Sequence, residues 1–116
     1  MLRPGVSGLS DNITVRSTVG RFLEHSRIFF FRNNGKNDLF LSSADWMDRN
    51  FFRRVEIAFP IFNERLKKRV LEEGLQMHFA ESAINWRMNS NGSYELRKSS
   101  SNQTTSCQDG LLKKYS

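Results

Sequence analysis

The chain has 116 residues, enough for one small domain with a single hydrophobic core. Eighteen Lys and Arg residues against twelve Asp and Glu residues give a formal net charge of +6, which favours anionic partners such as phosphates, nucleic acid or an acidic membrane surface. Cys107 is the only cysteine, so an internal disulfide and a multi-cysteine zinc site are both excluded. The sequence shows no signal-peptide pattern and no apolar run near the ~18 residues of a membrane span, so we expect a cytoplasmic protein.

The first elements of the chain are a loop, a short helix and a hairpin. Residues 3–12 are rich in Gly, Ser and Pro and predict a loop, and a domain that opens on such a loop is expected to lack the strand that precedes it. Ser17 is suited to cap a helix over residues 17–24. Two apolar runs, 27–33 and 38–44, flank the letters NGKN and predict two antiparallel strands.

The second half of the chain begins with a predicted third strand over residues 53–61, which alternates apolar and polar side chains. Residues 63–86 predict an amphipathic helix capped by Asn63, in which the basic residues 67–69 form a solvated face. A short edge strand is predicted over 92–98. The fold class is therefore α/β, with a small mixed or antiparallel sheet of three to four strands and one long helix.

The order of these elements brings three polar groups to neighbouring strand ends, where loops are rigidly held yet open to ligands. The first is His25 with Arg27. His25 is suited to act as a nucleophile or acid near neutral pH, although a capping or packing role is the alternative. Arg27 presents a forked donor array suited to phosphate oxygens, and the alternative is an ion pair with Glu24 or Asp45.

The second group follows the second strand. The hydroxyls of Ser42 and Ser43 and the carboxylate of Asp45 are suited to hydrogen-bond a ligand held close to the backbone. The alternative is that they cap a short helix beginning near Trp46.

The third group lies on the predicted third strand. Glu56 is placed to accept a hydrogen bond from the second ring nitrogen of His25 and so to orient the imidazole. Arg53 and Arg54 would point to opposite faces of that strand. Alternation places Arg54 on the face of Glu56, and therefore with the site.

Two long segments, LRPGVSGLSDNITVRSTVGRFLEHSRIFFF and SSADWMDRNFFRRVEIAFPI, closely resemble the C-terminal catalytic domain of the type-one polyphosphate kinase family. The resemblance runs from Leu2 to about Tyr94. It implies a phospholipase D-like α/β fold for a domain over residues 1–98, and the polar residues 99–116 are predicted to be a disordered tail. The implied activity is reversible transfer of the terminal phosphate of ATP onto a polyphosphate chain.

The resemblance also implies roles for individual residues. His25 falls on the second histidine of the family, which contacts the nucleotide phosphates and assists transfer. Arg27 and Ser43 fall on the His-x-Lys and Gly-Ser elements of the wider superfamily, with Ser42 in place of the glycine. Glu56 aligns with the downstream acid of the superfamily.

The resemblance further implies ATP or ADP with magnesium, and polyphosphate, as the ligands of the complete enzyme, with no specific nucleic acid. Full-length family members oligomerise, and they are expected to associate with membranes only peripherally. The histidine that becomes phosphorylated belongs to a preceding domain in the family. We therefore expect the 116-residue chain to be a fragment that is inactive by itself.

Two other functions fit the same residues. One is a phosphodiesterase or nuclease of the phospholipase D type, formed by two histidine-containing chains in a homodimer. Arg27 in place of the superfamily lysine, and Asp45 in place of its asparagine, argue against that function. The other is a basic module that binds polyphosphate or nucleic acid without catalysis.

Overall fold

The computed structural model describes residues 2–80, 83–97 and 106–116. The chain divides into two compact units. One unit runs from Leu23 to Gln76, and the other combines the residues up to Phe22 with those from Met77 onward. Each unit contains its own three-stranded antiparallel sheet, whereas the sequence analysis predicted one sheet of three to four strands.

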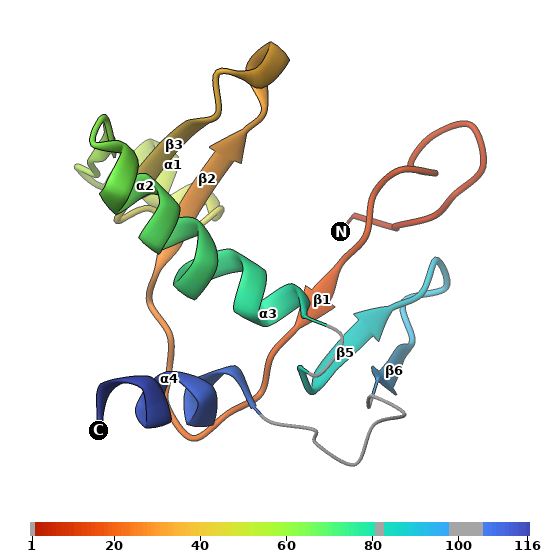
Figure 1. Ribbon diagram of the computed structural model, residues 1–116. Coiled ribbons are helices and arrows are strands. Elements are labelled where there is room, and N and C mark those ends of the chain that lie inside the picture. Colours follow the sequence, from red (N-terminus) through yellow and green to blue (C-terminus); the bar gives the residue numbers. More distant parts are fainter. Residues whose placement is uncertain (1, 81–82, 98–105) are drawn as a thin grey trace. The chain divides into compact units, whose positions relative to one another are not determined.

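The sheet of the Leu23–Gln76 unit has the strand order β2-β3-β4. It is formed by β2 (Arg27–Phe31), β3 (Asp38–Ser42) and β4 (Ala58–Pro60). β2 and β3 pair along their whole length, and the 3₁₀ turn η1 (Asn33–Gly35) closes the hairpin between them (Figure 1). The predicted hairpin is confirmed.

The hairpin turn explains why this segment contains so many asparagines. Asn33, Asn34 and Asn37 all have positive φ angles, at 35°, 52° and 54°. Asparagine is among the few residues with a side chain that adopt this left-handed region readily. Because the pair nearest the turn is Phe31 with Asp38, the turn is longer than the two-residue loop that an Asn-Gly pair most often forms.

The prediction of a strand over residues 53–61 is wrong for its first half. Helix α1 (Asp48–Arg53) occupies the preceding segment, and only Ala58–Pro60 pair with β3. Strand β4 lies at the edge of its sheet and contains Pro60. Proline has no N–H to donate, so an edge strand is where a sheet tolerates it.

The long amphipathic helix begins as predicted but ends earlier. Asn63 caps α2 (Glu64–Leu71), with its side-chain oxygen accepting from the N–H of Leu66 at 3.1 Å. The helix continues through a π-helical segment, η2 (Glu72–Gln76), and α3 (Met77–Phe79). The predicted extension to residue 86 is wrong, because residues from Asn85 onward pair in a strand.

The basic face of this helix is not uniformly solvated. Lys67 is buried, and its ammonium group donates to Glu64 at 2.7 Å. Lys68 and Arg69 are exposed and pair with Glu72 and Glu73, one turn later.

The second sheet has the order β1-β5-β6 and consists of β1 (Arg16–Ser17), β5 (Asn85–Met88) and β6 (Tyr94–Arg97). Strand β6 confirms the predicted edge strand. The predicted helix over 17–24 is wrong, because Arg16 and Ser17 pair instead with Arg87 and Trp86. The local pattern of apolar residues carries no information about a strand partner that lies about 70 residues away along the chain.

The polar end of the chain contains a helix. Ser106 caps α4 (Cys107–Tyr115), with its hydroxyl oxygen accepting from the N–H of Asp109 at 3.0 Å. The prediction of disorder over residues 99–116 is therefore wrong for this segment, and residues 98–105 lie outside the described residues. The division into a domain over 1–98 and a tail stays a prediction.

The buried apolar cores are small. Leu39 and Ala44 are buried in the Leu23–Gln76 unit, and Ala83, Met88 and Cys107 in the other. Across the described ranges, none of the helices has both the length and the apolar character needed to cross a bilayer.

Candidate functional site

The candidate site lies at one end of the β2-β3-β4 sheet. Arg27, the first residue of β2, pairs with Ser42, the last residue of β3, and Ser42 pairs with Ala58, the first residue of β4. The antiparallel register therefore brings the residues before β2, after β3 and before β4 to the same edge. This confirms the predicted convergence of three polar groups at neighbouring strand ends.

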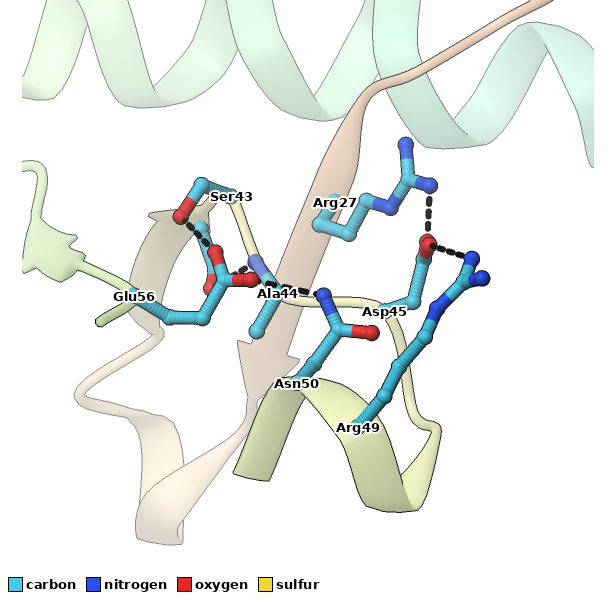
Figure 2. A network of polar contacts seen from close by, with 8 residues as sticks. Arg27, Ser43, Ala44, Asp45, Arg49, Asn50 and Glu56 are labelled. Atoms are coloured by element: carbon cyan, nitrogen blue, oxygen red, sulfur yellow. Dashed lines mark hydrogen bonds and ion pairs between the residues drawn. The ribbon is translucent and has the colours of Figure 1, made fainter. Parts of the chain in front are cut away.

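An ion-pair cluster forms around Asp45, in the loop that follows β3. Arg27 donates from Nη2 to Asp45 Oδ1, and Asp45 Oδ2 lies 3.9 Å from Nη2 of Arg49 (Figure 2). The side chains of Arg27 and Asp45 are only 19% and 27% exposed. The ion pair with Asp45 that we considered for Arg27 is thus present.

The surroundings of Asp45 favour its charged form. The hydrogen bond from Arg27 is the largest cause that lowers the pKa of Asp45 below its ordinary value, and the charges of Arg27, His25 and Arg49 lower it further. Within the described residues, the second terminal nitrogen of Arg27, Nη1, is buried without a hydrogen-bond partner. Asp45 therefore accepts a hydrogen bond from only one of the two terminal nitrogens of the guanidinium.

A second cluster forms around Glu56, in the segment before β4. The Ser43 hydroxyl donates to Glu56 Oε2, and Asn50 donates from Nδ2 to Glu56 Oε1 at 2.6 Å (Figure 2). These two hydrogen bonds, Ser43 first and Asn50 second, lower the pKa of Glu56, and the charge of Arg54 adds to them. Both carboxylate oxygens are thereby engaged.

Two serines connect the end of β3 to the segment before β4. Ser43 Oγ accepts from the N–H of Ile57 at 3.2 Å, and the N–H of Ser43 donates to the carbonyl of Ile57 at 3.1 Å. Ser42 Oγ donates to the same carbonyl at 3.0 Å and accepts from the N–H of Ala44 at 3.1 Å. Their expected alternative role as helix caps is wrong, because Met47 occupies the N-cap of α1 and makes no side-chain capping bond.

His25 lies in the exposed segment just before β2. The contact predicted between His25 and Glu56 is wrong, because the Glu56 oxygens accept from Ser43 and Asn50 instead. The charge of His25 acts on Asp45, whose pKa it lowers. The histidine thus belongs electrostatically to the Asp45 cluster.

The prediction that Arg53 and Arg54 point to opposite faces of a strand is wrong. Arg53 ends α1 and Arg54 follows it in an extended conformation, so neither lies on a strand. The positive charge of Arg54 nevertheless lowers the pKa of Glu56. Arg54 is therefore the arginine that acts on the site, although strand alternation is not the cause.

Arg49 and Asn50 were missed by the sequence analysis. Both lie on α1, and no catalytic or binding role was predicted for either residue. The spacing of Asp45 and Arg49, four residues apart, was an available signal of an ion pair, although Asp45 lies in the loop before α1 and only Arg49 lies on the helix. Asn50 is 3% exposed, and no periodic pattern indicates a buried asparagine in so short a helix.

The arrangement is chemically suited to binding an anion. Two arginines, Arg27 and Arg49, face the carboxylate of Asp45, and the Ser43 hydroxyl is held by the carboxylate of Glu56. No group of three or more His, Cys, Asp or Glu side chains capable of holding a metal ion occurs among the residues that the structure describes.

Comparison with known proteins identifies the relatives of this chain. The family model described as polyphosphate kinase C-terminal domain 2 matches residues 1–108. A protein named polyphosphate kinase from Paraburkholderia phytofirmans is 63% identical over 97 residues, which cover 84% of this chain. Another of the same name, from Burkholderia lata, is 55% identical over 114 residues, or 98% of this chain.

The fold has a counterpart among solved structures. The crystal structure of polyphosphate kinase from Porphyromonas gingivalis matches 91% of this chain with a TM-score of 0.82 and 32% sequence identity. The relatives are much longer. This chain spans 14% and 16% of the two bacterial sequences and 16% of the crystallised chain.

Proposed function

Because the chain belongs to the polyphosphate kinase family, as a part of its C-terminal domain, we propose that the sheet end described above is a phosphate-binding face used in phosphoryl transfer. In the complete enzyme the reaction is reversible transfer of the terminal phosphate of ATP onto polyphosphate. The observation that carries the proposal is the β2-β3-β4 register, which gathers Arg27, Ser43 and Glu56 at one edge.

Phosphoryl transfer requires mainly positioning, and positive charge against the equatorial oxygens of the phosphate in flight. Arg27 is anchored at the first residue of a paired strand, so its guanidinium is held by the sheet. Arg54 is exposed and supplies a second positive charge. We assign both residues to binding phosphate oxygens.

His25 is the residue to which we assign a direct catalytic contact. Its exposed position beside the Asp45 cluster allows a ligand phosphate to approach the imidazole. A histidine in this position is suited to donate a proton to an oxygen of the phosphate or to hydrogen-bond it. The covalent phosphohistidine is assigned to a preceding domain of the complete, phospholipase D-like enzyme.

Glu56 takes a different part from the one first expected. It accepts the Ser43 hydroxyl proton in a hydrogen bond, so it fixes the direction in which that hydroxyl points. The Ser43 oxygen also accepts from a backbone N–H, which holds it in place. We therefore assign Glu56 to positioning Ser43 at the edge of the phosphate-binding face; because the one hydroxyl proton of Ser43 is donated to Glu56, a phosphate oxygen can accept from Ser43 only in place of that carboxylate.

Magnesium is expected to accompany ATP. The carboxylates of this site do not offer a free ligand set, because the oxygens of Asp45 face two arginines and those of Glu56 accept from Ser43 and Asn50. The donor set therefore fits a metal that is held by the nucleotide phosphates and not by this chain. Magnesium bound in that way would neutralise phosphate charge.

Isothermal titration of the purified chain with medium-length polyphosphate, and with ATP plus magnesium, tests the proposal. The variants His25→Ala and Arg54→Ala are expected to weaken binding about tenfold each, because each removes a charge or hydrogen bond to the ligand. Arg53→Ala is the matched control, since it removes the same charge one residue away, on the last turn of α1. The affinity of Arg53→Ala is expected to differ from that of the wild type by less than about threefold.

Other outcomes distinguish the alternative functions. Equal losses in Arg53→Ala and Arg54→Ala, with no effect of His25→Ala and a steep dependence on salt, would indicate a basic module without a shaped site. Cleavage of a generic phosphodiester by the chain would indicate the phospholipase D-type enzyme. The 116-residue chain is expected to show no ATP turnover in a coupled kinase assay.

A further inference from the structure

Asp45 is surrounded by more positive charge than one carboxylate needs. Arg27 donates to one of its oxygens, Arg49 lies 3.9 Å from the other, and the charge of His25 also acts on it. Two arginines, one from β2 and one from α1, thus converge on a single carboxylate. Such an arrangement resembles an anion site in which a carboxylate of the protein takes the place of the anion.

The bonding of Arg27 supports this interpretation. A guanidinium can bind a carboxylate or phosphate through two parallel N–H donors, and this bidentate geometry is the strong one. Arg27 uses Nη2 toward Asp45, while Nη1 is buried without a partner among the described residues. A buried donor without an acceptor is costly, so a second acceptor at Nη1 would stabilise the guanidinium once the side chains around it rearrange.

The Glu56 cluster behaves differently. Its donors are the neutral groups of Ser43 and Asn50, so a phosphate would gain little by replacing the carboxylate there. At Asp45 the donors are cationic, and a phosphate group with more charge and more oxygens than a carboxylate competes well for them. A phosphate ligand is therefore expected to displace the carboxylate of Asp45 and not that of Glu56.

We propose that Asp45 is an internal counter-anion, which occupies the phosphate position on Arg27 and Arg49 until a phosphate of the ligand displaces it. The proposal rests on the phosphate-binding function given above and adds two points to it. Arg49 becomes a further phosphate-binding residue. Asp45 becomes a residue that lowers the affinity of the empty site for anions, so that only highly charged ligands, such as condensed phosphates, exchange with it.

The test is titration of the full chain with tripolyphosphate at fixed ionic strength. The Asp45→Asn variant keeps the shape and an acceptor oxygen for Arg27 but removes the competing charge, and it is expected to bind about tenfold more tightly than the wild type. Arg49→Gln is expected to weaken binding. Asp48→Asn is the matched control, because it removes one negative charge three residues away, in the first turn of α1.

A similar gain in Asp48→Asn and Asp45→Asn would overturn the proposal, since net charge alone would then explain the effect. Unchanged or weaker binding by Asp45→Asn, with binding by the wild type retained, would overturn the counter-anion role and leave the phosphate-binding function standing. If neither protein bound tripolyphosphate, the proposed function itself would fail, and the counter-anion role with it.

A second measurement covers a variant that does not fold. The carboxyl signal of Asp45 in the wild-type chain is followed by NMR as tripolyphosphate is added. Displacement from Arg27 removes the hydrogen bond that keeps the pKa of Asp45 low, so the pKa is expected to rise in the presence of the ligand. An unchanged Asp45 titration in the ligand-saturated chain would overturn the proposal.

Discussion

Asn50 is a single residue whose effect on Glu56 can be measured directly. Its amide is the second hydrogen bond, after that of Ser43, that lowers the pKa of Glu56. The Asn50→Asp substitution replaces this donor with a carboxylate next to Glu56. We expect the pKa of Glu56 to rise in the variant, because a like charge within hydrogen-bond distance disfavours ionisation. NMR titration of the Glu56 carboxyl signal measures the change.

The matched control for this prediction is Asn34→Asp, which makes the same chemical change in the hairpin turn of the same unit. It is expected to leave the Glu56 titration where it is in the wild type. An equal displacement in both variants, or none in Asn50→Asp, would show that the Asn50 hydrogen bond does not set the protonation of Glu56.

The two site carboxylates also predict how stability depends on pH. Asp45 and Glu56 have pKa values lowered from the ordinary 3.8 and 4.5, so the unfolded chain binds these two protons more readily than the folded chain. At a pH above the pKa values of the unfolded chain, the two carboxylates make their full contribution to the free energy of unfolding. This contribution is lost as the pH falls through the lower pKa values of the folded chain. Urea unfolding at pH 7 and at pH 3 measures this loss.

The double variant Asp45→Asn/Glu56→Gln supplies the comparison for the acid dependence. It lacks both groups, so its unfolding midpoint is expected to fall less between pH 7 and pH 3 than that of the wild type. An equal fall in the two proteins would assign the acid sensitivity to other carboxylates.

The site residues show what a sequence reveals at this scale. The ion pair of Arg27 with Asp45 was among the alternatives open from the sequence, and the structure contains it. The prediction that His25 is the hydrogen-bond partner of Glu56 was wrong, because we expected Glu56 to lie in a strand that faces His25. It lies instead between α1 and β4, where Asn50 of α1 donates to it. Errors about partners therefore followed from one error about an element.

Gly74 is a feature of the long helix whose role depends on the element packed against it. Helix propensity predicts that Gly74→Ala stabilises a helix by about 1 kcal/mol. A Cβ atom at this position would overlap Cδ1 of Ile28 on β2, so the isoleucine would have to move. We expect Gly74→Ala to be neutral or destabilising by about 1–2 kcal/mol, as for overpacked sites, in urea unfolding.

A double-mutant cycle separates these two effects. Ile28→Val removes the Cδ1 atom, so Gly74→Ala made in that background is expected to regain the stabilisation that helix propensity predicts. Equal effects of Gly74→Ala in both backgrounds would mean that the contact between η2 and β2 does not limit the substitution.

Helix α4 depends on one side chain that the sequence did not indicate. The Gln108 amide accepts from the N–H of Phe22 and donates to the carbonyl of the same residue, both at 2.8 Å, and Gln108 is buried. Gln108→Ala leaves both backbone groups unpaired and is expected to destabilise this unit by about 1–3 kcal/mol. Gln76→Ala, at an exposed position, is the control and is expected to have little effect on the unfolding midpoint.

The elements that were predicted well are those specified by nearby residues. The β2-β3 hairpin and the Asn63 cap depend on contacts within about fifteen residues. Of the elements that were missed, β1 and α4 depend on partners about 70 and 86 residues away along the chain, whereas β5 pairs with the nearby β6 and was missed because a helix was predicted over its first residues. Tertiary contacts of this kind override local propensity and leave no periodic signal.

The whole molecule exposes many large apolar side chains, in keeping with its small cores. The segment that contains α1 and β4 exposes eight of them, which we call the apolar surface: Trp46, Met47, Phe51, Phe52, Val55, Ile57, Phe59 and Phe62. Strand β4 is also an edge strand, which presents unpaired backbone groups to solvent. Apolar side chains together with an open strand edge favour association of one chain with another.

We therefore expect the purified chain to self-associate with rising concentration, and we expect substitutions in the apolar surface to oppose this. Val55 and Phe62 are 100% and 83% exposed, so Val55→Ser/Phe62→Ser is expected to weaken association without lowering the unfolding midpoint. Sedimentation velocity over a range of concentrations measures the effect. Val19→Ser/Leu23→Ser, at two other exposed apolar positions, is the control. Equal weakening by both pairs would show that association is general hydrophobic sticking and does not depend on the apolar surface.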